Sequence, residues 1–459
     1  MSKITQAGEF TVDKLEILTS TGIAQLDFEK NVVGIDLAES IFTNTVFATL
    51  AVVDNNNLIS NMHFIGQEYI TLKLSTPSLD SPIVDKVFSV VSVSGRQDIS
   101  VGAQIYTLNC VSPELLRSNR TRVTQSYTDT NSNIIKEILK DPSLLQSHKK
   151  FVVEKSQGIR KHIATNMRPL EFIRNLTRES ISASNSGSPH FLFYENLDGF
   201  NFVTLDSLYN QDATASFEVG EVLAIDAEVK KDYEEDFSRL LDYLPSNTID
   251  MLKGSRAGMF GSNLIKYNIF EKRYEVTDYK YLRDFNQFSR IREKPKYNNI
   301  DVELDKTDAR RHLHPTSNSE GTDIRYDDAS YVDNQCEQWI LSRRSRMLEL
   351  TMGDTHVVSI HGRAGLTIGD KVHMTIPITG KSHGGSEEDP NTGDFLITQI
   401  KHSFTQEPAR KHMMTMTVNT DGSSREFINV AKGNLQVFNK PNILIQFPTP
   451  EDCIKSTPR

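Results

Sequence analysis

The 459-residue chain is longer than one hydrophobic core usually supports, and its length favours roughly three domains. Hydrophobic residues make up 37% of the sequence and charged residues 24%, which excludes a disordered or fibrous protein. The formal net charge of -9 argues against a nucleic-acid-binding surface, because phosphate contacts need clustered lysine and arginine. A channel through which nucleic acid passes without binding stays compatible with this charge.

The sequence contains no signal for a membrane segment, for secretion or for a disulfide framework. Mean hydropathy is -0.41, and no apolar run approaches the roughly 20 residues that a membrane helix needs. The first residues lack the apolar segment of a signal peptide, so we expect the chain to fold in the cytoplasm. Cys110, Cys336 and Cys453 are odd in number and far apart, and we expect incidental thiols.

The first hundred residues predict short strands. Residues 46–53 are rich in β-branched and aromatic side chains and end at 54–57, where one Asp and three Asn form a strong turn signal. Further strands are expected at 69–74, 87–93 and 104–110. Short strands at this spacing, separated by polar breaks, indicate a small antiparallel barrel or sandwich.

From Pro113 the apolar period becomes helical. Residues 134–139 present one apolar face of a helix, and a second helix opens at Pro169, which suits a first turn. The runs 191–195 and 200–205 are aromatic and alternating and lie on either side of an Asp-Gly turn, which predicts a hairpin. We therefore expect an α+β domain here.

The third quarter of the chain is mixed. Residues 218–253 predict a strand at 224–229 and a helical tract at 236–244. The stretch 254–333 is polar, rich in Tyr and Arg and poor in apolar clusters, which indicates an inserted, partly irregular lobe. Helical signal returns at 335–350, and strands follow it.

The later strands repeat the pattern of the early ones. Residues 64–72 and 367–375 both read apolar, glycine, polar and then strand, with Gly66 and Gly369 in the same place. Two further strands follow in the same order in each half: 87–93 and 104–110 in the first, 395–403 and 412–419 in the second. Each glycine is expected to supply a positive φ that sets the register of the next strand. A chance likeness stays an alternative, because short β patterns are common.

If the repeat is real, it constrains assembly. Three copies of a chain with two similar barrels place six quasi-equivalent barrels around one axis. Such a ring would join a six-fold tube to a three-fold object, as a geometric adapter.

Several segments resemble the baseplate central hub proteins of contractile-tailed, T4-like phages. These segments are 112–116 continuing into Gln125-Ser126-Tyr127, 166–173, 191–202, 253–262 and 362–372. The most specific is the hairpin, whose family-like residues are Phe193, Tyr194, Glu195, Asp198, Gly199 and Phe200. Together the segments span roughly residues 40–422.

The resemblance implies a mainly β fold with an α+β part: two similar antiparallel, tube-like β-barrel domains, an intervening α+β domain and an insertion lobe. The expected units are 1–112 (first tube-like domain), 113–217 (α+β domain), 218–253 plus 334–422 (second tube-like domain), 254–333 (insertion lobe) and 423–459 (C-terminal tail). The long stretch 254–333 and the tail depart from a compact member of the family.

The function that the resemblance implies is structural. The chain would form a homotrimeric, pseudo-six-fold ring in the tail baseplate of a virion, assembled in the host cytoplasm. Its partners would be itself, the central spike, the tail tube or a tube-initiator protein, and baseplate wedge proteins, with DNA passing through the channel unbound. The alternatives are the hub of a related injection machine, such as a tailocin or a type VI apparatus, and a tail-associated cell-wall hydrolase.

The sequence contains no motif that predicts catalysis. A Gly-x-Ser-x-Gly elbow, a His-Glu-x-x-His helix and a Walker loop are absent, and the glycines at 254, 258 and 261 lack dinucleotide spacing. The acidic runs 234–236 and 387–389 consist of adjacent carboxylates, whereas glycosidase carboxylates face each other across a cleft. We therefore expect no enzymatic activity and no cofactor.

Two groups of side chains have both a structural and a functional interpretation. The histidines lack the spacing of a third and fourth metal ligand, so no metal site is expected; they are His312, His314, His361, His373 and His383. Arg343, Arg344 and Arg346 lie toward the end of a predicted helix. They would either complement the helix dipole or meet the acidic surface of a partner.

Overall fold

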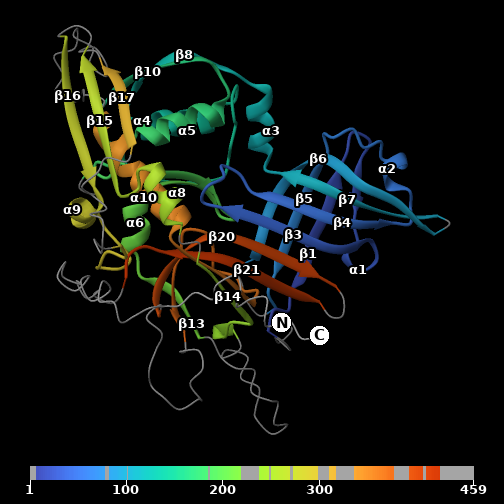
Figure 1. Ribbon diagram of the computed structural model, residues 1–459. Helices are drawn as coiled ribbons and strands as arrows, with labels where there is room; N and C mark the ends of the chain where they lie inside the picture. The colour runs from blue at the N-terminus through green and yellow to red at the C-terminus, as the bar shows by residue number, and fades with distance from the viewer. Residues whose placement is uncertain are drawn as a thin grey trace, which may run out of the picture.

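The computed structural model describes most of the chain as a mainly β structure with a smaller helical part (Figure 1). The described residues are 7–77, 82–100, 102–184, 187–218, 237–247, 250–268, 272–297, 310–316, 335–376, 392–406 and 410–423. The expected strand at 224–229, the acidic runs at 234–236 and 387–389, His383, and the tail from 424 lie outside them. Among the described residues, no helix is both long and apolar enough to cross a membrane.

The first β domain consists of strands whose side chains alternate between core and solvent. Its strands are β1 (Thr11–Leu18), β2 (Ile23–Gln25), β3 (Val32–Ser40), β4 (Phe47–Asp54), β5 (Tyr69–Ser75), β6 (Pro82–Ser100) and β7 (Ala103–Val111), with short helices α1 (Phe28–Asn31) and α2 (Leu58–Asn61). In β4, Ala48, Leu50 and Val52 are buried and their neighbours are not, as the period of two requires. These strands enclose one hydrophobic core.

The second β domain is built from strands that lie far apart in the sequence. They are β13 (Ala213–Glu218), β14 (Asp242–Asn247), β18 (Asp354–His361), β19 (Lys371–Thr375), β20 (Gly393–Thr405) and β21 (Lys411–Thr420). Their inward side chains form a second core that includes Val358, Met416 and Phe395. The helix expected at 236–244 is wrong for its second half, because Asp242–Asn247 pairs with β18 as a strand.

The two β domains belong to one sheet. Its path runs β14-β18-β21-β20-β3-β4-β7-β6-β5-β1-β2, with β13 and β19 branching from β20. Among the described residues this path is open, so two sheet domains replace the closed barrels that the sequence suggested. The mainly β architecture with large antiparallel sheets is as expected.

The α+β part packs its helices against two small sheets. Its elements are α3 (Pro113–Arg120), β8 (Val123–Asp129), α4 (Asn131–Lys140), β9 (Lys150–Val153), β10 (Arg160–Met167), α5 (Pro169–Glu179), β11 (Phe191–Glu195), β12 (Gly199–Thr204) and α6 (Leu205–Asn210). Ile134, Ile135 and Ile138 are fully buried on one face of α4, which is the face that the sequence predicted. Pro169 stands in the first turn of α5, also as predicted.

The stretch expected to be an irregular lobe contains a regular sheet. It holds α8 (Met251–Ala257), β15 (Gly261–Asn268), β16 (Arg273–Lys280), α9 (Tyr281–Asp284), a short 3-10 turn (Phe285–Gln287) and β17 (Arg310–Thr316). The sheet order is β16-β15-β17, and this sheet lies at the opposite end of the molecule from the first β domain (Figure 1). A helical segment follows, a π turn at Gln338–Ser342 continuing as α10 (Arg343–Met352), which packs on this sheet and on the second β domain.

Candidate assembly interface

Strands β3 and β20 join the two β domains. They pair antiparallel from Gln399 opposite Ser40 to Thr405 opposite Gly34. Polar side chains reinforce the joint: the Ser403 hydroxyl donates to Asp36 at 2.7 Å, and the Lys401 ammonium lies 3.0 Å from Asp36. A continuous backbone ladder of this length is a rigid connection, because each pair of residues adds hydrogen bonds and cross-strand contacts.

The two β domains share one strand order. The first runs β1-β5-β6-β7-β4-β3 and the second β13-β19-β20-β21-β18-β14. The register also shifts in the same place, between Val90 and Ser92 in the first domain and between Ile397 and Gln399 in the second. One difference is the direction of the edge strand, since β1 is antiparallel to β5 whereas β13 is parallel to β19. A common order and a common bulge make the repeat a property of the fold, beyond a likeness of patterns.

Gly66 and Gly369 stand at equivalent turns and both adopt a positive φ, +78° and +90°. Each precedes the strand that pairs with the long strand of its domain, β5 with β6 and β19 with β20. Their surroundings differ. A Cβ on Gly66 would meet no atom within 4 Å, whereas a Cβ on Gly369 would lie 2.3 Å from the Tyr194 hydroxyl oxygen.

The hairpin of β11 and β12 lies inside the molecule and contacts three cores. Phe193 stacks on Phe200 with ring centroids 5.5 Å apart, within the core of the α+β part. Tyr194 points the other way, into the core of the second β domain, and Leu197 packs against the first. Asn196 closes the turn by accepting hydrogen bonds from the amides of Asp198 and Gly199 at 3.0 and 2.9 Å. Asp198 itself is exposed.

Glu195 is the polar centre of this hairpin. Its buried carboxylate lies 2.7 Å from the Lys86 ammonium of β6 and 2.7 Å from the Lys149 ammonium, and it accepts from the Val46 amide at 3.3 Å. Lys149 also binds Glu114 of α3. Burial raises the pKa of Glu195, but the two ammonium groups outweigh burial and hold that pKa below its usual value. The carboxylate therefore stays charged and connects the α+β part to the first β domain.

The three candidate arginines make their contacts within the chain. Arg343 donates to the Phe191 carbonyl at 3.0 Å, and Arg344 donates to the Ala257 carbonyl at 3.1 Å. Burial, followed by the nearby Arg178, lowers the pKa of Arg343 to about 10. Arg346 is only 2% exposed, so its guanidinium does not offer a surface to a partner. A role of the other two at an interface stays a prediction.

A buried charge network that sequence reasoning missed surrounds Arg346. Arg346 donates to the Ser289 carbonyl at 2.7 Å and lies 3.6 Å from Asp206 and 3.8 Å from Asp421. Arg290 bridges Glu349 of α10 and Asp421 after β21. These ion pairs join residues from four distant parts of the sequence, so no local pattern could reveal them. They anchor the inserted stretch to the second β domain.

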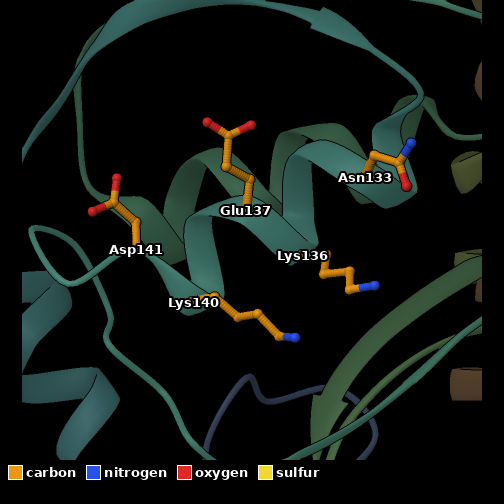
Figure 2. A pocket seen from close by; sticks show the side chains of 5 residues that line it. All are labelled: Asn133, Lys136, Glu137, Lys140 and Asp141. Carbon is orange, nitrogen blue, oxygen red and sulfur yellow. The ribbon is translucent and has the colours of Figure 1, made fainter.

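The described residues hold no cluster of three or more His, Cys, Asp or Glu side chains that could bind a metal ion. His314 packs edge-on against Trp339, and His373 bonds Asp394 at 2.8 Å. One surface hollow is lined by Asn133, Lys136, Glu137, Lys140 and Asp141 of α4 and its end. Figure 2 shows that Glu137 and Asp141 point to one side of this helix while Lys136 and Lys140 point to the other. Side chains that diverge into solvent do not form a substrate site.

No protein-family model matches the sequence, and no curated protein matches it. Solved structures do. A tail protein from Neisseria meningitidis MC58 superposes with a TM-score of 0.50 at 8% identity, covering 89% of this chain and 96% of that one. A 43 kDa tail protein of prophage MuSo2 from Shewanella oneidensis gives 0.49 at 9% identity, covering 89% and 98%.

A component of the E. coli type VI secretion system, described as structurally similar to the T4 bacteriophage tail proteins gp27 and gp5, gives a TM-score of 0.42 at 9% identity, covering 92% of this chain and 80% of that one. The match to the Neisseria tail protein extends over nearly the whole of both chains. At 8% identity it establishes a shared fold with that tail protein.

Proposed function

We propose that the chain is a structural protein of a phage tail baseplate, a central hub that connects the tail tube to the spike as a homotrimer. The observation that carries this proposal is the duplicated β domain: one chain contains two sheets of the same strand order, joined by β3 and β20. The fold shared with a tail protein from Neisseria meningitidis supports the setting in a virion tail.

The duplicated β domain suits a trimer to the role of an adapter. Three copies supply six similar β domains, which match a six-fold tube on one side, while the three identical α+β parts and insertions match a three-fold spike on the other. An overall charge of -9 suits a channel that lets DNA pass, because such a protein offers phosphate groups few favourable contacts. Tail tube or initiator, spike and wedge proteins are the partners of this proposal.

We also propose that the protein acts through its surfaces, without catalysis. Three buried acids of the described residues support this. Glu195, Asp206 and Asp421 are buried, and each pairs with a lysine or arginine side chain inside the fold. Charge networks of this kind stabilise structure, whereas a catalytic group must reach a substrate.

The mass of the purified protein in solution tests the proposal. Light scattering coupled to size-exclusion chromatography should give three times the chain mass of 51.9 kDa, and the same sample should leave purified peptidoglycan intact. A stable monomer that degrades peptidoglycan would instead identify a tail-associated hydrolase.

A further inference from the structure

The two β domains can be superimposed residue by residue through their ladders. Across the first domain, one row of paired residues reads Asp36, Thr49, Asn109, Ser92; across the second, the equivalent row reads Leu244, Val357, Thr417, Gln399. Strand β14 therefore occupies in the second domain the place that β3 occupies in the first. Likewise, β6 is the equivalent of β20.

This equivalence leaves two strand edges without their counterpart. In β20, the segment after the bulge pairs with β21 on one side and with β3 on the other. In β6, the equivalent segment 92–100 pairs with β7 on one side, and no described strand lies on the other. The outer edge of β14 also lacks a neighbour among the described strands.

Both edges have the character of surfaces that are covered in an assembly. Beyond the end of β5, segment 92–100 of β6 is the edge of the sheet, since its neighbour β7 pairs with β4 on its other side. Every residue of β6 from Val91 to Ser100 is exposed, including Val93 and Ile99 at 38% and 58%. On and beside β14, Leu241 and Leu244 are 41% and 60% exposed. Open edges flanked by apolar side chains are templates for another strand.

We propose that β14 of one copy pairs antiparallel with segment 92–100 of β6 in the next copy, repeating between chains the joint that β3 and β20 make within one. This inference rests on the proposed homotrimer and names its contact. One edge of each kind per copy gives a head-to-tail interface, which can close into a ring.

The internal joint also predicts the register between copies. Asp36, the equivalent of Leu244, lies opposite Ser403 in the β3–β20 ladder. Within the second domain, Ser403 pairs with Met413 of β21. The residue of the first domain that is equivalent to Met413 is Ile105 of β7, and Ile105 pairs with Gln97 of β6. Leu244 should therefore lie opposite Gln97 of the next copy.

A pair of cysteines tests this contact. Residues directly opposite each other in an antiparallel ladder have Cβ atoms about 4.5 to 5.5 Å apart, close to disulfide range. In a Cys453→Ser background, with Cys110 and Cys336 buried, the double variant Leu244→Cys/Gln97→Cys should form disulfide-linked trimers under mild oxidation. A mixture of the two single variants should give linked dimers only, which proves that the bond forms between copies.

The matched control is Leu244→Cys/Lys161→Cys, which moves one cysteine to an exposed position on β10 and should give no linked chains. Light scattering on the same samples separates the outcomes. A trimer that forms no Leu244–Gln97 link overturns this contact and leaves the homotrimer standing. A protein that stays monomeric at every concentration overturns both.

Discussion

Glu195 shows how a single buried residue holds distant parts of this chain together. Its carboxylate accepts from Lys86 of the first β domain and from Lys149, which lies between α4 and β9 in the sequence. The resemblance to hub proteins singled out Glu195 from its hairpin, but it did not reveal this role. Lys86 is 109 residues away in sequence, and no local pattern links the two positions.

Removing the charge at Glu195 should destabilise the fold strongly. Glu195→Gln leaves the Lys86 ammonium buried without its counter-charge, which costs about 3 to 5 kcal/mol. Urea unfolding followed by circular dichroism measures the change. The control is Glu16→Gln, because its ion pair with the exposed Lys14 lies at the surface and contributes less than about 1 kcal/mol. Equal effects of the two substitutions would show that the Glu195 network does not stabilise the fold.

His412 should make stability depend on pH in the mildly acidic range. Burial and the neighbouring His402 hold the pKa of His412 well below its usual value of 6.5, so the folded state keeps it neutral. The unfolded chain binds a proton below pH 6.5, and stability falls as the pH drops through that value. Replacing His412 by Phe retains the stack on Phe404. Below pH 6.5, this change should reduce the slope of the free energy of unfolding against pH by about 1.4 kcal/mol per pH unit.

The matched control for this slope is His148→Phe, since His148 is exposed in the folded protein. Free energies of unfolding measured between pH 5 and 8 on the three proteins decide the point. A His412→Phe slope equal to that of the unmodified protein would mean that protonation of His412 is not coupled to unfolding.

At the scale of elements, the sequence predicted the helices and turns that interactions between nearby residues determine. The faces of α4, the start of α5 and the β11–β12 hairpin were all predicted, because apolar period, Pro position and turn residues act within a few residues. The sequence predicts a helical tract over 236–244, but residues 242–244 lie in strand β14. Their pairing with β18, more than 100 positions away, overrides that preference.

The two turn glycines should respond differently to the same substitution. Gly66→Ala places a side chain in open space and costs only the backbone strain of a positive φ, about 1 to 2 kcal/mol. Gly369→Ala pays the same strain and also drives a methyl group against the Tyr194 hydroxyl, which adds about 1 to 3 kcal/mol. Urea midpoints of both variants measure the difference. Equal losses would contradict the close contact between the second-domain turn and the hairpin.

At the scale of the whole molecule, the sequence predicted a repeat but not its consequence. Gly66 and Gly369 revealed two similar domains, since the turn and the strand after it are local features. The sequence did not predict that both domains join into one sheet. Strands β3 and β20 lie more than 350 residues apart, and the composition of neither strand indicates which strand it pairs with. The third strand of the sheet β16-β15-β17 was missed for the same reason, because β17 joins β15 across more than 40 residues. The hairpin of β15 and β16 is local, and it was missed because this stretch is polar and poor in apolar clusters.

Electron microscopy of the purified protein tests the adapter geometry most directly. Class averages viewed along the symmetry axis should show a three-fold ring in which six similar densities surround a central opening, because each copy contributes two β domains of one strand order. Single copies, or rings of another symmetry in which the two β domains of a chain do not alternate around the opening, would contradict the account.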